Sequence, residues 1–433
     1  MNILIAGATG FIGSRLRTAL LARGHRVVGV ARRAPSGAAP GEWIALDFGR
    51  VTREDWAVHL AGIDAAVNAV GILRQTPAQR FAELHVGGPT TLFEACARHG
   101  VRRVVQVSAL GADEQAETDY HRSKKMADDV LLALPLDAAV VQPSLVFGPA
   151  GASARMFLGW ASLPVLPLPA GGGQPVQPVH VDDVVQALVV LVETMPAPWR
   201  GARVPLVGPA PTTLAGYLQS LRAAMRLPPA RTVSIPAGAM QRLARVGDRL
   251  PGSLLDTDSW RMLQRGNVAP ADATAALLGR PPREPARFVE ADHASAARSQ
   301  ARLAWLLPLL RLSLALVWIV TGIVSMGVYP VDESYALLAR SGVPEALRPT
   351  MLYGAAALDL ALGVLTLWPL RQRRSRLALW ASQAALILVY TAIITIRLPE
   401  FWLHPYGPVL KNLPILAALL LLAMLDPGEE PPG

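Results

Sequence analysis

The first thirteen residues constrain the fold of this chain most. Asn2–Ala6 is a short apolar run, the glycine-rich segment Gly7–Gly13 follows it directly, and a helical pattern covers Ser14–Arg23. A strand, a tight glycine turn and a helix in this order are typical of the phosphate-binding turn of a doubly wound parallel sheet. The amino end of such a helix offers free N–H groups and a positive dipole end to a pyrophosphate.

Each of the three glycines has its own expected task. Gly7 permits the sharp turn, Gly10 lets backbone approach a pyrophosphate, and Gly13 lets the helix pack closely on the strand. A second strand over Arg26–Val30 supplies the context that distinguishes this turn from an ordinary one. We therefore predict that a nicotinamide dinucleotide binds at the turn, against Gly7, Thr9, Gly10, Phe11, Ile12 and Gly13.

The end of the second strand favours NADP(H) over NAD(H). Strands that bind NAD end in an acidic residue for the ribose 2′-hydroxyl, whereas here Ala31 is followed by Arg32 and Arg33. A guanidinium pairs with a 2′-phosphate in a fork of two hydrogen bonds. The alternative is that the two arginines simply solvate a loop.

The second strong signal is a tyrosine and a lysine four residues apart. Tyr120 and Lys124 share one face of a helix at this spacing. The Lys124 ammonium can then hold the nicotinamide ribose and lower the pKa of the Tyr120 phenol from its ordinary value of about 10. Ser108 ends the strand Arg103–Ser108, at the carboxyl edge where doubly wound sheets bind ligands. We predict that Ser108, Tyr120 and Lys124 are catalytic, with Tyr120 as the general acid or base.

The spacing of these motifs resembles the extended and atypical short-chain dehydrogenase/reductases. Over residues 1–290 the chain resembles the subgroup that contains the NADPH-binding accessory subunit of respiratory complex I. The segments that carry the resemblance are Gly7–Gly13, Asn68–Gly71, Val107–Asp113, Tyr120–Asp128 and Gln142–Pro149. It implies an α/β fold, a Rossmann-type doubly wound parallel sheet with a small substrate lobe.

The same resemblance implies further cofactor contacts. It places Asp47 against the adenine, although a turn aspartate is the alternative, and it places Pro143 and Val146 beside the nicotinamide. It brings backbone close to the cofactor at Asn68, Ala69, Val70 and Gly71. His85 occupies a place that often carries asparagine in relatives, and a packed core histidine is an equal alternative.

The last third of the chain differs in character from the rest. Hydrophobic residues make up 52% of the 433 residues, and the excess lies after residue 300. Four apolar segments there reach or approach the roughly 20 residues that cross a bilayer. They are Leu303–Val328, Met351–Leu370, Leu377–Ile396 and Val409–Leu425. We predict a linker over 291–302 and a four-span α-helical membrane bundle over 303–428, which resembles the DoxX-like membrane family.

Arginines beside these segments orient the bundle. Arg298 and Arg302 precede the first segment, and the loop between the second and third holds Arg371, Arg373, Arg374 and Arg376. Because arginines favour the inner side of a membrane, both ends are expected in the cytoplasm of a bacterial-type inner membrane. The formal charge of +9 has no basic block with interleaved aromatic residues, so nucleic acid is not an expected partner.

Three other observations bound the function. Cys96 is the single cysteine, so no intrachain disulfide forms, and burial is its default role. No cluster with metal-ligand spacing is found. Asp359 lies within the second apolar segment with Arg311 as a candidate partner, either as a structural pair or as a quinone or proton site.

The sequence thus predicts a membrane-anchored NAD(P)(H)-dependent oxidoreductase acting on a carbonyl or alcohol. The fusion to a membrane bundle suggests a lipophilic substrate such as a quinone or isoprenoid. One alternative is a non-catalytic module that binds NADPH as a structural or sensory element of a membrane complex. Another is an NAD-dependent epimerase or dehydratase. The stretch between Ser108 and Tyr120 is short for such an enzyme, which argues against this alternative.

Overall fold

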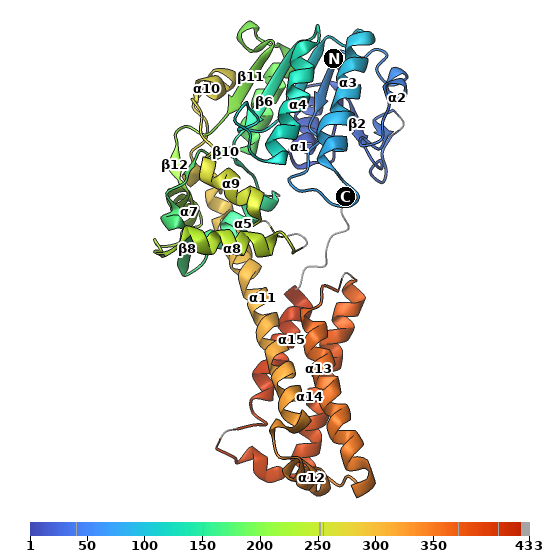
Figure 1. The fold of residues 1–433 in the computed structure, drawn as a ribbon, viewed down its shortest axis with the longest axis vertical. Helices are drawn as coiled ribbons and strands as arrows, with labels where there is room; N and C mark the ends of the chain where they lie inside the picture. Colours follow the sequence, from blue (N-terminus) through green and yellow to red (C-terminus); the bar gives the residue numbers. More distant parts are fainter. Residues whose placement is uncertain are drawn as a thin grey trace. The chain divides into compact units, whose positions relative to one another are not determined.

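The computed structural model describes residues 1–39, 41–149, 151–250, 253, 255–370, 372–405 and 407–425. The chain divides into two compact units, Met1–Arg302 and Leu303–Gly433. Figure 1 shows a layered α/β arrangement in the first unit and a bundle of helices in the second.

A seven-stranded sheet with strand order β11-β6-β5-β4-β1-β2-β3 forms the centre of the first unit. Every neighbouring pair in it is parallel. The strands are β1 (Asn2–Ala6), β2 (Arg26–Ala31), β3 (Trp43–Ala45), β4 (Ala65–Asn68), β5 (Arg103–Val107), β6 (Asp137–Pro143) and β11 (Ala202–Leu206). The chain winds outward on both sides of β1 and β4, so the predicted Rossmann-type doubly wound sheet is confirmed.

Helices cover both faces of this sheet (Figure 1). Ile3 and Ile5 of β1 pack with α1 (Phe11–Ala22) and α6 (Val181–Glu193). Leu4 and Ala6 pack on the opposite face with α3 (Gly88–Arg98) and α4 (Asp119–Ala133), where Cys96 is fully buried. Because both faces are covered, β1 is apolar at every one of these positions, as expected of a strand within a parallel sheet.

A smaller lobe holds the rest of the first unit. Its core contains Phe147, Phe157, Tyr217 and Phe288, and the rings of Phe147 and Phe288 stack with centroids 4.9 Å apart. Its helices are α5 (Ala152–Ala161), α7 (Leu214–Ala224), α8 (Ala237–Gly247) and α9 (Thr257–Arg265); α10 (Asp272–Leu278) packs with α6. Its strands are β7 (Val146–Phe147), β8 (Val165–Pro169), β9 (Pro175–Val176), β10 (Val179–His180), β12 (Thr212–Thr213) and β13 (Arg231–Ile235).

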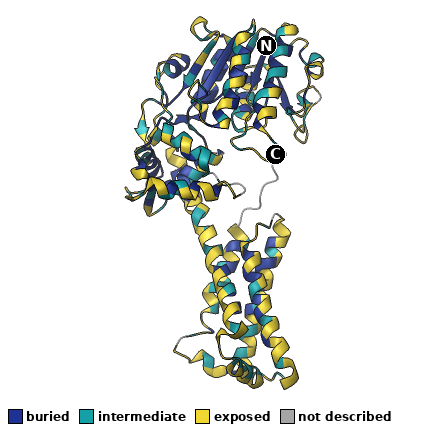
Figure 2. Ribbon diagram, viewed as in Figure 1, coloured by how far each residue is buried: buried dark blue, intermediate teal, exposed yellow. Residues whose placement is uncertain are grey.

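The second unit holds α11 (Ala294–Ile323, which begins in the first unit), α12 (Val331–Arg340), α13 (Arg348–Leu367), α14 (Arg373–Arg397) and α15 (Asn412–Leu425). Among the residues that the structure describes, three helical segments are long and apolar enough to cross a membrane: Ala291–Val328, Glu345–Leu367 and Arg373–Arg397. The fourth predicted span is only the 14-residue helix α15, so four spans are not confirmed. Figure 2 shows exposed residues over most of these helices, as expected of surfaces that contact lipid. Arg371 lies outside the described residues.

Polar side chains connect the helices inside the second unit. Trp318 Nε1 donates to Gln383 Oε1 over 2.8 Å, and Gln383 Nε2 donates to Thr366 Oγ1 over 2.8 Å. Arg311 donates to the Thr366 carbonyl oxygen, 3.4 Å away. Within the described ranges no ion pair joins Arg311 to the buried Asp359. The predicted partnership is therefore wrong, because Arg311 bonds the Thr366 carbonyl, two turns further along α13 than Asp359.

Candidate active site

The glycine turn between β1 and α1 is closed by backbone contacts that leave no room for side chains. Gly7 has a φ of +79°, and a Cβ there would lie 2.8 Å from the Ala69 carbonyl carbon. A Cβ on Gly13 would lie 2.2 Å from the Gly7 carbonyl oxygen. Gly10 is exposed and caps α1 without a side-chain hydrogen bond, beside the exposed Thr9. The turn and the uncapped helix end therefore fit the pyrophosphate of a dinucleotide.

The two apolar residues of the turn pack inward. Phe11 and Ile12 are half-buried against the core on the α1 side of the sheet. A Cβ on Gly148 would lie 2.8 Å from Phe11 Cζ, so the first turn of α1 touches the loop after β7.

The loop after β4 connects this turn to the helix α4. β4 ends at Asn68, and residues 69–71 form a loop. The buried Asn68 donates to Gln106 Oε1 over 2.7 Å, and its Oδ1 accepts from the Val70 N–H over 3.1 Å. Gly71 is exposed, and a Cβ there would lie 3.0 Å from Lys124 Nζ. Asn68–Gly71 thus lies between the glycine turn and Lys124.

Lys124 is buried and ties two loops together. Its Nζ donates to the carbonyl oxygens of Val70 and Val107, each over 3.1 Å. Burial lowers the pKa of the ammonium to about 8. The amine therefore lies between the carboxyl ends of β4 and β5, next to Ser108.

Tyr120 lies one turn before Lys124 among other rings. Its ring centroid is 5.6 Å from that of His85 and 6.0 Å from that of Phe81. Burial and the negative charge of Asp128 raise the pKa of the phenol to about 12. The lowered pKa that the spacing predicts is thus not found in the protein alone, because desolvation dominates and two carbonyls engage the Lys124 ammonium. At neutral pH Tyr120 is a neutral proton donor.

Ser108 is bound to a carboxylate that the sequence analysis did not select. Its Oγ donates to Asp128 Oδ2 over 2.5 Å, and both residues are buried. Asp128 Oδ1 is buried without a hydrogen-bond partner in the described part of the chain. Burial raises the pKa of this carboxyl to about 7. The repeat of Tyr120, Lys124 and Asp128 at intervals of four residues was the signal that could have identified it.

His85 is a packed histidine whose two ring nitrogens are both engaged. The Ile72 N–H donates to its Nε2 over 3.0 Å, and Nδ1 lies 2.9 Å from Ser123 Oγ. Because the Ser123 hydroxyl donates to the Tyr120 carbonyl oxygen, the proton of the neutral ring is assigned to Nδ1. Burial and the Lys124 charge lower its pKa to about 3. His85 lies in a π-helical turn (Ala82–Gly87) that precedes α3, and it positions the loop after β4.

Two residues, one at the end of α9 and one just beyond it, hold the loop that connects β5 to α4. Arg265 donates to the Gly111 carbonyl oxygen over 2.9 Å and to Asp113 Oδ2 over 2.6 Å. Asn267 donates to the Leu110 carbonyl oxygen over 3.4 Å. The smaller lobe thus fixes the segment beside Ser108, and no local motif predicts these contacts.

The other predicted cofactor residues lie at the same edge of the sheet or close to it. Arg32 and Arg33 directly follow β2 and are exposed, with no ion pair among the described residues. Asp47 accepts from the Gly49 N–H over 3.2 Å and is thus a turn aspartate with an exposed carboxylate. The Pro143 carbonyl oxygen accepts from the Leu110 N–H over 3.0 Å, and Val146 begins β7.

Two protein families match different parts of this chain. Residues 3–200 match the NAD dependent epimerase/dehydratase family, and residues 315–420 match the DoxX-like family. The MoeE5 structure in complex with UDP-glucuronic acid and NAD is similar with a TM-score of 0.51 and 22% identity. That likeness covers 70% of this chain and 100% of MoeE5, and it supports the fold.

Curated relatives extend these similarities. A 3-diazoavenalumate denitrifying reductase from Streptomyces sp is 31% identical over 56% of this chain and 87% of its own length. Ceramide reductase from Caulobacter vibrioides is 28% identical over 44% of this chain and 61% of its own length. The 40 kDa subunit of NADH-ubiquinone oxidoreductase from Neurospora crassa is 26% identical over 34% of this chain and 39% of its own length. The resemblance to the complex I subunit is therefore confirmed, over part of each chain.

Proposed function

This chain belongs to the NAD dependent epimerase/dehydratase family, and from that membership we propose that it is a membrane-bound, NADP(H)-dependent reductase of a lipophilic carbonyl compound. One observation carries the proposal: Ser108 and the Lys124 ammonium lie at the carboxyl end of β5, and the neutral phenol of Tyr120 lies one turn of α4 before Lys124. This is the edge at which doubly wound sheets bind their ligands.

The reaction that we propose transfers a hydride and a proton to a carbonyl group. When bound, the reduced nicotinamide supplies the hydride. Tyr120 gives its phenolic proton to the carbonyl oxygen, so the C=O π bond is replaced by one C–H and one O–H bond. Ser108 donates a hydrogen bond to the same oxygen and orients it. The Tyr120 phenolate then takes a proton from solvent, and Lys124 stabilises that anion while it persists.

The protonation state of Tyr120 supports the direction of reduction. A phenol with a pKa of about 12 is protonated at neutral pH and is ready to act as an acid. Oxidation of an alcohol would need the phenolate, which burial disfavours. Two relatives carry the word reductase in their names, in agreement with this direction.

The two arginines after β2 support NADP(H) as the cofactor. MoeE5 was solved with NAD, and a dinucleotide is common to both cofactors, so the preference rests on Arg32 and Arg33. Both guanidinium groups are exposed beside the turn that fits the pyrophosphate, where a 2′-phosphate would gain charge-assisted hydrogen bonds.

The membrane helices and one relative support a lipophilic substrate. Ceramide reductase acts on a lipid by its name, and the DoxX-like family match and the apolar helices of this chain support a membrane location. Quinones and isoprenoid carbonyls are the first candidates. The arginines at the start of α14, Arg373, Arg374 and Arg376, support a bacterial-type inner membrane with the nucleotide-binding unit in the cytoplasm.

A second candidate is a module that holds NADPH without turnover, as a structural or sensory part of a membrane complex. The similarity to a complex I subunit supports it. An epimerase or dehydratase is a third candidate, supported by the family match.

One experiment on the protein purified in detergent separates these candidates. The bound nucleotide is released and identified, its exchange is measured, and NADPH oxidation is followed with long-chain aldehydes, ketones and quinones. We expect the bound nucleotide to exchange and NADPH to be oxidised, and we expect Tyr120→Phe to abolish that oxidation. NADPH that stays bound and only stabilises the fold would favour the structural module. NAD that is reduced and reoxidised with no net consumption would favour the epimerase.

A further inference from the structure

Helix α8 has three distinct faces. Met240, Ala244 and Gly247 are buried, and Met240 and Ala244 pack in one cluster with Trp260. Leu243 and Val246 of α8, and Leu250 in the turn that follows it, recur at the same helical spacing but are 49%, 53% and 54% exposed. The apolar residues of this segment therefore exceed what its own core needs, and one apolar face stays exposed among the described residues of the first unit.

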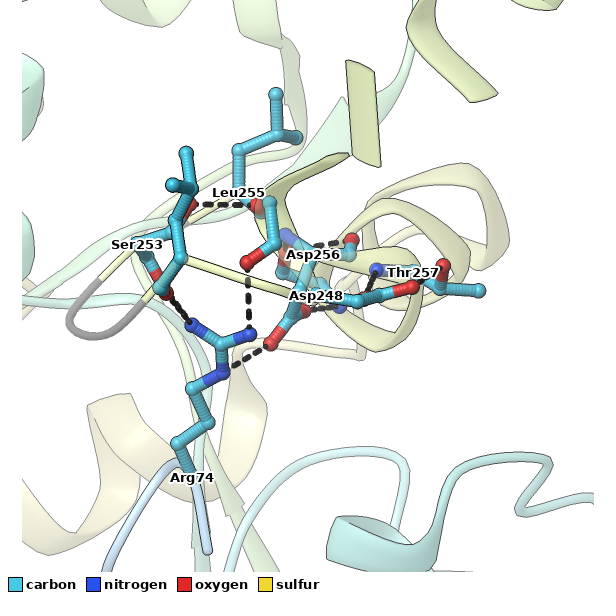
Figure 3. A network of polar contacts seen from close by, with 9 residues as sticks. Arg74, Asp248, Ser253, Leu255, Asp256 and Thr257 are labelled. Atoms are coloured by element: carbon cyan, nitrogen blue, oxygen red, sulfur yellow. Dashed lines mark hydrogen bonds and ion pairs between the residues drawn. The ribbon is translucent and has the colours of Figure 1, made fainter. Parts of the chain in front are cut away.

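Three arginines lie beside this apolar face. Arg242, Arg245 and Arg249 repeat the spacing one position earlier along the helix, and all three are exposed. None of them forms an ion pair within the described residues. The one acidic residue of the segment 237–250, Asp248, accepts from the N–H and hydroxyl of Thr257 over 2.8 and 2.7 Å (Figure 3). The exposed side of α8 is thus apolar and cationic.

The end of α8 is held firmly by a residue of the loop after β4. Arg74 donates to the carbonyl oxygens of Gly247 and Ser253 over 3.0 and 2.7 Å, and its Nε lies 2.9 Å from Asp256 Oδ2. Figure 3 shows this guanidinium among the carbonyl and carboxylate oxygens of the connection between α8 and α9. The apolar and cationic face is therefore presented by an anchored helix rather than by a loose end.

We propose that this face of α8 and the turn after it, formed by Leu243, Val246, Leu250, Arg242, Arg245 and Arg249, lies on an anionic lipid surface. Apolar side chains with arginines beside them match the acyl boundary and the phosphates of a bilayer, because the arginine stems lie along the apolar layer while the guanidinium groups reach the headgroups. The described part of the same chain contains three helices long and apolar enough to cross a membrane, so the first unit is tethered to a lipid surface. The proposal does not depend on the catalytic activity.

Lipid contact is tested on the full chain in nanodiscs. Cys96 is fully buried and is replaced by Ser; a single cysteine then carries an environment-sensitive fluorophore at residue 246, through Val246→Cys. The matched control is Val58→Cys, at an exposed valine at the end of α2 (Arg53–Ala57). The discs contain phosphatidylcholine with phosphatidylglycerol, with or without a lipid that carries a quencher near its headgroup.

The expected result is a blue-shifted emission at residue 246 that the labelled lipid quenches, while emission at residue 58 is unaffected. The triple variant R242Q/R245Q/R249Q, or discs of phosphatidylcholine alone, should lose most of the quenching, and the control triple R26Q/R98Q/R102Q should keep it. Equal quenching at residues 246 and 58 would overturn the proposal. A blue shift without lipid quenching would overturn it as well, because protein would then cover the face.

Discussion

The Ser108 hydroxyl donates to Asp128 Oδ2 over 2.5 Å inside the first unit, where both side chains are buried. The pKa of Asp128 is raised to about 7, so its charge changes within the physiological range. When Asp128 is ionised, its carboxylate accepts the hydrogen bond of the Ser108 hydroxyl. When Asp128 is protonated, it donates to Ser108 Oγ instead, and the serine hydroxyl is free to donate to a substrate oxygen.

Carbonyl reduction should therefore become faster as the pH falls through about 7. We expect kcat/KM to be about tenfold higher at pH 6 than at pH 8, which is the effect of one hydrogen bond to the substrate. In Asp128→Asn the amide donates to Ser108 at every pH, so the profile should be flat and high. If Asp128→Asn kept the wild-type pH dependence, the change of kcat/KM near pH 7 would belong to another group, such as Lys124.

The stability of the fold should respond to pH in the matching direction. A carboxyl whose pKa is higher in the folded than in the unfolded state stabilises the fold fully below the unfolded pKa of about 3.9, and this contribution is lost as the pH rises through about 7. Asp128→Asn should therefore raise the melting temperature more at pH 8 than at pH 5. Equal shifts at both pH values would contradict the raised pKa of Asp128.

Removal of the Tyr120 hydroxyl should abolish turnover and spare nucleotide binding. Tyr120→Phe keeps the ring that packs near Phe81 and His85, so the site should stay folded. Loss of a positioned general acid typically costs about 10²–10⁴ in rate. Single-turnover NADPH oxidation and NADPH binding measure the two effects, and Tyr335→Phe in α12 is the control. Unchanged turnover in Tyr120→Phe would remove the proposed mechanism.

Local spacing predicted much of the fold and part of the site. The glycine turn follows from residues that are neighbours in the chain, and β1 (Asn2–Ala6) has the predicted bounds. Tyr120 and Lys124 lie on α4 as their spacing of four residues predicts. Asp128 shares this spacing, but its importance depends on Ser108, which lies 20 residues earlier and meets it only through packing.

What the sequence did not reveal depends on contacts between distant segments. Arg265 and Arg74 donate to backbone carbonyl oxygens more than 150 residues away. Because every residue has a backbone carbonyl, the residue pattern does not mark which of them accepts such a bond. The pKa of Tyr120 was predicted with the wrong sign because spacing reports the Lys124 charge but not burial. α12 was missed because it is a short helix between two apolar segments that dominate the pattern.

The arginines after β2 should set the choice between the two cofactors. Arg32→Ala/Arg33→Ala removes both exposed guanidinium groups and should lower the preference for NADPH over NADH about tenfold to a hundredfold, the value of one charge-assisted hydrogen bond to a phosphate. Isothermal titration with each nucleotide measures the ratio. Arg98→Ala, at an exposed arginine of α3, should leave it unchanged. A double variant with an unaltered ratio would refute the assignment.

Close approach at Gly13 should make the dinucleotide site intolerant of a single methyl group. In Gly13→Ala the new Cβ would stand 2.2 Å from the Gly7 carbonyl oxygen, so α1 or the turn must move. We expect a loss of about 1–3 kcal/mol in stability, as for other overpacked sites, together with loss of NADPH binding. Gly173→Ala is the matched control, because nothing lies within 4 Å of its Cβ and its φ is −77°. Thermal unfolding with and without NADPH tests both expectations: Gly173→Ala should keep the stabilisation by NADPH, and Gly13→Ala should lose it. If Gly13→Ala kept that stabilisation, the pyrophosphate would have to bind away from this turn.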